Sequence, residues 1–393
     1  MRASHPPAPA VLRAGDAALQ PRGTGLEGRW LACAVLFALG IAAMGAGFVQ
    51  GWGIKNALSW AAGAGLFAIG ILGFVWRHRD ENRRDARSQR LETFGPGNAI
   101  TLTRGLMLAM TGGFLFAPRP TGFLVYVPAI LYTSAIVADL FDGVAARRAD
   151  FSTLLGARLD IELDGFGVLL AFLLAVHLGQ LPTWFIVVGL GRPLFTLGLS
   201  WRKRSGRDIH ELPSSRHRKL LAGIQMGFLS AALWPVMSRH ALTLLGLCLL
   251  LPTIVGFLRD WLVVSGRATP SGPTYGKLHR WTARLVARDL PTVIRVLSPL
   301  ALVWLFIQPL SGSAALTGLA IVGILSILLG LVGRAGAIAV IVAIGIHSGS
   351  TALDTWTAVV FAGAAGVLLF GTGPMSLLKP EEPYVLSDVR AEA

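Results

Sequence analysis

The chain has 393 residues, of which 53% are hydrophobic and only 14% are charged, and its formal net charge is +14. A soluble domain carries about 25% charged residues, so the composition excludes an ordinary soluble protein and indicates a membrane protein. A strongly basic membrane protein is attracted to anionic lipid, and we do not infer nucleic-acid binding from the charge. Cys33 and Cys248 lie in apolar runs, where we expect free thiols and no disulfide.

The apolar runs along the chain predict an all-α, polytopic integral membrane protein. Residues 1–29 are rich in Ala, Pro and Arg and lack the apolar core of a signal peptide, so we expect a disordered cytoplasmic tail. A helix needs about 20 apolar residues to cross a bilayer. Runs of this kind lie near 30–50, 56–76, 99–117, 122–143, 153–179, 182–200, 219–237, 241–263, 291–309, 314–331, 335–349 and 354–371. The last four have blurred boundaries, and the pattern leaves a re-entrant segment open there.

Shifts in composition divide the chain into modules. Residues 30–77 predict two extra transmembrane helices, and residues 78–264 predict a core of six helices that begins with a basic juxtamembrane segment, which we expect to be an interfacial helix. A basic cytoplasmic linker is expected at 265–290, a four-helix membrane domain at 291–379 and a tail at 380–393. The linker is marked by the run T-P-S-G-P, which is typical of a loop.

Basic residues are concentrated in alternate loops. The loops near 77–90, 147–158, 202–219 and 264–290 are rich in Lys and Arg. The opposite loops hold little beyond Lys55, Arg119 and Arg239. Because basic loops stay in the cytoplasm, we expect a protein of the cytoplasmic membrane with both termini on the cytoplasmic side.

Four aspartates form the pattern that carries most information about function. Asp139 and Asp142 are three residues apart, and Asp160 and Asp164 are four residues apart, so each pair lies on one face of a helix. The short stretch between the pairs allows the two helix ends to fold back on each other. Four carboxylates around one point suit hard divalent cations and phosphate oxygens, and by the loop charges this point faces the cytoplasm.

The pattern D-x2-D-G-x2-A-R-x8-G-x3-D-x3-D, together with the segment P-G-N-A-I-T-L-T-R at 96–104, resembles the CDP-alcohol phosphotransferase family over residues 78–264. The resemblance implies a six-helix core and the transfer of a substituted phosphate group from a CDP-alcohol to an alcohol, with release of CMP. It implies that Asp139, Asp142, Asp160 and Asp164 bind metal and that Asp164 is also the catalytic base. Because the expected ligands are all oxygen, we expect two Mg²⁺ or Mn²⁺ ions.

The same resemblance implies a nucleotide site made of small and polar residues. Gly143 lacks a Cβ and allows the nucleotide to approach, Ala146 keeps the helix face thin, and Arg147 can bond a phosphate with two donors. Gly156 permits close packing where the next helix begins.

Three further residues, Asn98, Thr101 and Thr153, are implied to line the cytidine nucleotide pocket. For Asn98 and Thr101 helix capping is an equal alternative, because both lie near the start of a helix.

The acceptor site is expected at basic residues of later helices. Arg192 lies within an apolar run, where a charge is costly and usually functional. Lys219 and Arg259 are further candidates, because family members that use phosphorylated acceptors carry basic residues in these regions. The alternatives are topology for the loop residues, which include Lys219, and a local pair with Asp260 for Arg259.

We therefore predict a membrane phosphatidyltransferase of phospholipid biosynthesis. The expected donor is CDP-diacylglycerol or a similar CDP-alcohol, and the acceptor is a small alcohol such as glycerol 3-phosphate or inositol phosphate. A homodimer is compatible with the sequence, and the C-terminal part resembles DoxX-like membrane proteins. The alternative function is a non-catalytic or transport-type membrane protein whose aspartates only bind ions.

Overall fold

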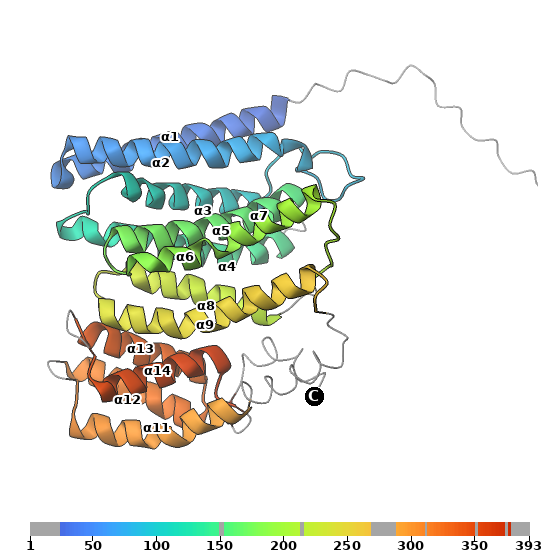
Figure 1. Ribbon diagram of the computed structural model, residues 1–393. Helices are drawn as coiled ribbons and strands as arrows, with labels where there is room; N and C mark the ends of the chain where they lie inside the picture. The colour runs from blue at the N-terminus through green and yellow to red at the C-terminus, as the bar shows by residue number, and fades with distance from the viewer. Residues whose placement is uncertain are drawn as a thin grey trace, which may run out of the picture.

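The computed structural model describes residues 24–148, 153–212, 216–268, 288–310, 313–349, 353–373 and 376–378. Within these ranges the regular secondary structure is helical, apart from an isolated bridge between Leu331 and Leu378. The helices lie side by side in a stack, with the N-terminal pair at one side and the C-terminal module at the other (Figure 1). The predicted all-α, polytopic fold is confirmed, and both cysteines are free.

Each of the twelve predicted apolar runs overlaps a helix. The helices are α1 Thr24–Trp52, α2 Ile54–Arg77, α3 Pro96–Gly113, α4 Val127–Arg148, α5 Leu154–His177, α6 Ile186–Gly189, α7 Gly191–Arg204, α8 Arg216–Leu233, α9 Arg239–Val264, α11 Leu290–Ile307, α12 Ala314–Leu329, α13 Gly333–His347 and α14 Thr355–Phe370. The run at 182–200 is not one straight helix, because a bend of 44° separates α7 from the segment before it.

Six helical segments of the described chain are long and apolar enough to cross a membrane, and there are seven if the bent pair Thr183–Gly189 and Gly191–Arg204 is counted as one span. The helix α5 is 24 residues long but carries the acidic residues of the predicted site. The helices α12, α13 and α14 have 16, 15 and 16 residues, fewer than the roughly 20 that cross a bilayer.

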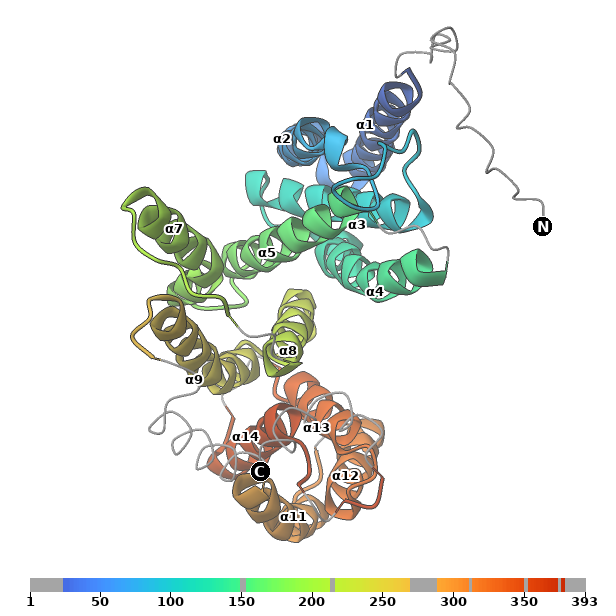
Figure 2. The ribbon, with the colours of Figure 1, turned by 90° about the vertical axis from the view of Figure 1, so that its right-hand side faces the viewer.

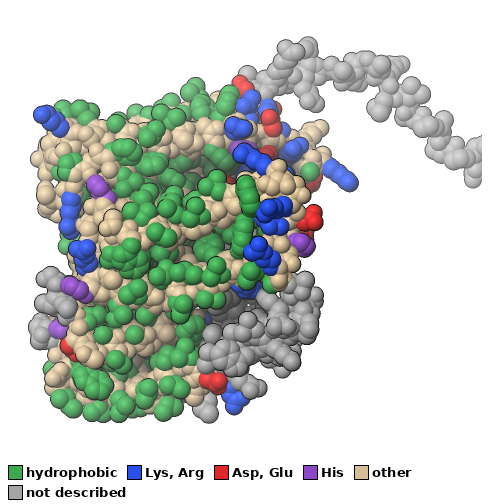
Figure 3. Space-filling model, in the orientation of Figure 1, with side chains coloured by type: hydrophobic (Ala, Val, Ile, Leu, Met, Phe, Trp, Pro, Cys, Tyr) green, Lys and Arg blue, Asp and Glu red, His purple; other side chains and the backbone are tan. Residues whose placement is uncertain are grey.

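The surface agrees with a lipid environment. Hydrophobic side chains are spread over the face of the stack that Figure 3 shows, and Lys and Arg side chains gather mainly at the end where α2, α7 and α9 finish. Leu36, Ile69 and Leu251 are 62%, 71% and 69% exposed. Large apolar side chains at such exposure are expected against lipid and unusual against water.

The expectation of an interfacial helix between α2 and α3 is wrong. The segment has only a short 3-10 turn at Arg79–Glu81, followed by bends and turns up to Pro96. The Asp85 carboxylate accepts hydrogen bonds from the backbone N–H groups of Arg87 and Ser88, at 2.8 and 2.9 Å. Bonds from a side chain to nearby backbone compete with helix formation.

The tryptophan Trp60 joins the N-terminal pair to the core. The Trp60 indole nitrogen donates to the Met110 carbonyl at 3.0 Å, and a Cβ on Gly113 would lie 2.6 Å from the Trp60 carbonyl oxygen. The helix α2 therefore approaches α3 closely, and α3 also contacts α4 and α5. This places α3 between the N-terminal pair and the two aspartate helices.

The C-terminal module packs on the far side of the core. Figure 2 shows α11 to α14 grouped beside α8 and α9, away from α3, α4 and α5. The Ser238 backbone N–H donates to the Gly345 carbonyl at 2.8 Å, and the Met237 side chain packs where a Cβ on Gly345 would be. The module therefore supports α8 and α9 but does not border the aspartates.

Candidate active site

Three of the four predicted metal ligands converge. Asp139 projects from α4, and Asp160 and Asp164 project from successive turns of α5. One carboxylate oxygen of each lies within 4.8 Å of the other two. The side chains are 25%, 41% and 30% exposed, so the cluster is open on one side. Asp142 lies in the part of α4 whose side chains are outside the described residues.

Arg104 of α3 lies at the centre of these carboxylates. Its Nη1 atom is 2.5 Å from Asp139 and 2.7 Å from Asp160, and its Nη2 atom pairs with Asp164. Only 4% of the Arg104 side chain is exposed. A buried charge is tolerated when it is paired, so three helices are joined through one guanidinium.

A second junction forms where α3 and α5 begin. The Thr153 hydroxyl accepts from the Gly156 backbone N–H at 3.0 Å and thereby caps α5. The Asn98 amide donates to the same hydroxyl at 3.0 Å, and a Cβ on Gly156 would overlap the Asn98 carbonyl oxygen. Gly156 is therefore needed for this close approach.

The junction also holds the loop that precedes α3. The Asn98 amide donates to the side-chain oxygen of Asn82 at 3.2 Å, and Asn82 is fully buried. Asn82 in turn donates to the carbonyl groups of Leu91 and Thr93, at 2.8 and 3.1 Å. Asn98 does not cap α3, because the N-cap of that helix is Gly95.

The remaining predicted nucleotide residues lie on two helices. The buried Thr101 hydroxyl donates to the Gly97 carbonyl at 3.0 Å, within α3. Gly143, Ala146 and Arg147 belong to the last turns of α4, and their side chains are outside the described residues.

Of the predicted acceptor residues, Arg192 reaches the aspartate helix. Its Nη2 atom donates to the Ile161 carbonyl of α5 at 2.6 Å. A Cβ on Gly165 would lie 2.8 Å from the Arg192 Nε atom, so the arginine rests against α5 beside Asp164.

The other two acceptor candidates are not shown at this point in the part of the chain that the structure describes. The Arg259 guanidinium is 3.9 Å from Asp260, which also receives a hydrogen bond from Arg218 at 3.2 Å. The local pair named as the alternative for Arg259 is therefore present. Lys219 belongs to α8, with a side chain outside the described residues.

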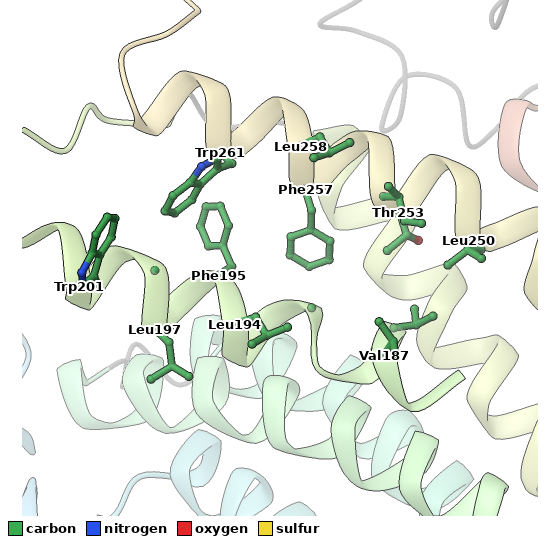
Figure 4. A pocket seen from close by; sticks show the side chains of 14 residues that line it. Val187, Leu194, Phe195, Leu197, Trp201, Leu250, Thr253, Phe257, Leu258 and Trp261 are labelled. Atoms are coloured by element: carbon green, nitrogen blue, oxygen red, sulfur yellow. The ribbon is translucent and has the colours of Figure 1, made fainter. Parts of the chain in front are cut away.

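An apolar pocket lies away from the aspartates. A groove of about 680 Å³ runs between α7 and α9 and is lined by aromatic and aliphatic side chains that include Phe195, Trp201, Phe257 and Trp261 (Figure 4). Among the described residues that line this groove, none has an ionisable side chain. It suits hydrocarbon and offers nothing to a phosphoryl group, so the chemistry belongs with the aspartates.

Sequence reasoning missed two residues of the site, Arg104 and Asn82. Arg104 stands in the segment 96–104, but nothing in its local spacing shows that it meets carboxylates 35 to 60 positions later. Asn82 lies in an arginine-rich run with no distinguishing pattern. A charged residue in the middle of an apolar run was the available signal for Arg104.

Residues 96–255 match the family model of the CDP-alcohol phosphatidyltransferases. The matched range runs from α3 into α9 and contains both aspartate helices. No curated protein and no solved structure matches the chain.

The protein therefore carries a CDP-alcohol phosphatidyltransferase domain, as the aspartate pattern predicted. It is a transferase for substituted phosphate groups, which it takes from a CDP-alcohol. The family depends on divalent metal. The match ends before α11, so the DoxX-like resemblance of the C-terminal module stays a prediction.

Proposed function

We propose that this protein transfers the phosphatidyl group of CDP-diacylglycerol to a small phosphorylated alcohol and releases CMP. The observation that carries the proposal is the convergence of Asp139, Asp160 and Asp164 from two helices inside a CDP-alcohol phosphatidyltransferase domain. The apolar sides of the stack suit a donor that lies in the bilayer.

The residues present fit two divalent cations. The donor atoms are carboxylate oxygens, which Mg²⁺ and Mn²⁺ prefer over soft ligands, and the described three lie within 4.8 Å of one another. Asp139, Asp160 and Asp164 would hold the ions together with Asp142. Bound ions would neutralise the pyrophosphate of the donor and the charge that develops on the departing CMP.

Asp164 is proposed as the base. The acceptor hydroxyl oxygen forms a bond to the phosphorus distal to cytidine, the bond from that phosphorus to the CMP oxygen breaks, and the hydroxyl proton goes to the Asp164 carboxylate. Asp164 suits this task because 30% of its side chain is exposed and the next residue, Gly165, lies against Arg192.

Arg192 is proposed to bind the acceptor. A guanidinium can bond a phosphate with two donors, and Arg192 rests against Gly165, next to the proposed base. A phosphate held there would direct the other end of a short acceptor toward Asp164. Glycerol 3-phosphate and inositol phosphate both have the required phosphate and free hydroxyl. Lys219 and Arg259 remain weaker candidates.

The cytidine end of the donor is proposed to lie near the helix junction. The Asn98, Thr153 and Gly156 group, which is joined by hydrogen bonds of the junction, and Thr101, which bonds within α3, would line one side, and Gly143, Ala146 and Arg147 would line the other. In this arrangement the junction, with Asn98 packed against Gly156, positions the starts of α3 and α5, and Gly143 would leave room for the nucleotide.

The site is proposed to face the cytoplasm. Lys and Arg side chains gather mainly at one end of the stack (Figure 3), and basic ends remain in the cytoplasm. A single cysteine at Ser205, in a chain with Cys33 and Cys248 replaced by Ser, should react with a membrane-impermeant reagent only after cells are opened. A cysteine at Thr121 should react in intact cells. The opposite pattern would reverse the orientation.

The function is tested with purified protein in lipid nanodiscs. CDP-diacylglycerol labelled in the cytidine is supplied with Mg²⁺ and each of glycerol 3-phosphate, inositol phosphate, serine and unphosphorylated inositol. We expect CMP release that depends on a phosphorylated acceptor and is lost in Asp160→Asn. Metal binding without CMP release from any acceptor would instead favour a non-catalytic, ion-binding membrane protein.

A further inference from the structure

Arg104 contacts the carboxylates that are the proposed metal ligands. Its partners are the Oδ1 atoms of Asp139, Asp160 and Asp164. A divalent ion needs the lone pairs of such oxygens directed at itself, whereas the guanidinium directs N–H groups at them. The ions and Arg104 therefore compete for the same side of the cluster.

Arg104 partly neutralises the charge of the three carboxylates. Three carboxylates carry a formal charge of −3, and the guanidinium reduces it to −2. Like charges at this separation repel strongly in a partly buried place. Arg104 itself lies in a helix apolar enough to cross the membrane, where an unpaired charge is costly. The arginine therefore reduces the repulsion among the carboxylates, and the carboxylates offset the cost of burying the arginine charge.

The packing limits where Arg104 can move. On the inner side, a cavity of about 10 Å³ is lined by residues that include Leu108, Tyr132 and Met226, which leaves room for one water at most. On the outer side, the Asp160 side chain is 41% exposed. A displaced guanidinium would therefore shift toward the open side of the cluster, from which the donor phosphates arrive.

We propose that Arg104 is a resident counter-cation, which holds the three aspartates together when no divalent ion is bound and is displaced from them when the ions bind. The proposal rests on the metal assignment of the proposed function. Arg104 is then a positioning residue with two effects. It keeps the carboxylates together before metal binds, and it lowers the apparent affinity of the site for metal.

The test compares Arg104→Gln with Arg295→Gln in nanodiscs. Arg295 is the control, because it is also an arginine of an apolar helix, although it is half-buried where Arg104 is buried, and its described bond goes to the Leu328 carbonyl at 2.6 Å. Mn²⁺ binding is measured by electron paramagnetic resonance of the free ion, and melting is measured with chelator and with Mn²⁺.

We expect Arg104→Gln to bind Mn²⁺ roughly tenfold more tightly than the unchanged protein, since it loses a competing charge-assisted interaction. Its melting temperature should fall in chelator and rise more on Mn²⁺ addition than that of either other protein. Equal or weaker Mn²⁺ binding by Arg104→Gln would overturn the proposal, as would the same gain in Arg295→Gln.

Two further outcomes have a defined meaning. If Arg104→Gln does not fold, Arg104→Lys replaces it. A lysine ammonium cannot bridge three carboxylates as the planar guanidinium does, so tighter Mn²⁺ binding is again expected, and unchanged binding overturns the proposal. Mn²⁺ binding without CMP release would reject the transferase but leave the competition standing. Absence of Mn²⁺ binding in every variant would reject both.

Discussion

The transferase core and the C-terminal module both carry arginines on apolar helices, but the partners of these arginines differ. In the core, Arg104 of α3 pairs with Asp139 of α4 and with two aspartates of α5. In the module, the Nε atoms of Arg295 and Arg334 donate to the backbone carbonyls of Leu328 and Leu368, at 2.6 and 3.2 Å.

The carbonyl partners explain the arginines of the module. Leu328 and Leu368 lie in the last turns of α12 and α14, where carbonyl groups lack partners within the helix and a cation is favoured. Both bonds span nearly the same sequence distance, 33 and 34 residues. The hairpins α11–α12 and α13–α14 are therefore joined in the same way, by an arginine that bonds a carbonyl group at the end of the next helix. Arg104 instead contacts the carboxylates of the candidate site.

The comparison teaches that a buried arginine indicates chemistry through its partners. Carboxylates that converge from other helices can exchange the guanidinium for a metal ion or a substrate. An arginine that bonds backbone carbonyl groups at a helix end only caps that helix.

The largest effect is expected for the proposed base. Asp164→Asn keeps the shape of the side chain but removes the basic carboxylate, so CMP release should fall by about 10²–10⁴-fold while much of the donor binding remains. The control is Asp354→Asn in the module, which should retain activity because Asp354 lies at the start of α14. Near-normal release by Asp164→Asn at saturating metal would move the base to another residue.

The next effect concerns the acceptor. Arg192→Gln should raise the KM for a phosphorylated acceptor about 10- to 100-fold, the equivalent of a lost charge-assisted bond, and leave the KM for the donor nearly unchanged. Arg295→Gln, the matched change in the module, should alter stability and neither KM. Equal acceptor KM values in the two variants would remove Arg192 from the acceptor site.

The sequence predicted the elements and the aspartates because both are local patterns. Apolar runs mark the helices, and the spacings within Asp139 to Asp164 determine which side chains share a face. The partnership of Arg104 depends instead on how α3 packs between α2, α4 and α5, which no short spacing encodes.

The errors of prediction also have physical causes. The segment after α2 was expected to be helical, but the side-chain bonds of Asp85 and the buried Asn82 hold it as a loop. The bend before α7 was missed because an apolar run does not show where packing against other helices interrupts a helix. Gly189, which ends the segment before the bend, packs closely on α5, since a Cβ on Gly189 would lie 2.9 Å from Phe172.

A stability effect of intermediate size is expected at the helix junction. In Gly156→Ala the new Cβ would overlap the Asn98 oxygen, and overpacking of this kind costs about 1–3 kcal/mol. The control is Gly223→Ala in α8, where no neighbouring atom lies within 4 Å of the added carbon. That change should stabilise the helix slightly. Equal melting temperatures for the two variants would contradict the described junction.

The smallest effect belongs to the module. The Asp354 carboxylate caps α14 and accepts bonds from the Thr357 hydroxyl and the backbone N–H groups of Thr357 and Trp356. Asp354→Ala should cost about 1 kcal/mol of stability at neutral pH and leave transfer unchanged. A loss of CMP release in this variant would link the module to catalysis.

The contribution of Asp354 to stability depends on pH. The hydrogen bond from Thr357 lowers the pKa of Asp354 below its ordinary value of 3.8. The stabilisation is therefore complete above that value and is lost as the pH falls through the lowered pKa. The difference in melting temperature between the unchanged protein and Asp354→Ala should shrink only in strong acid. A constant difference would show that the charge plays no part.

The central claim is that the aspartates around Arg104 act through divalent ions, and one measurement tests it most directly. CMP release from CDP-diacylglycerol is followed in nanodiscs with acceptor present, first with an excess of chelator and then after Mg²⁺ or Mn²⁺ is restored. We predict that release stops with chelator and returns with either ion. Full release of CMP in the presence of chelator would contradict the account.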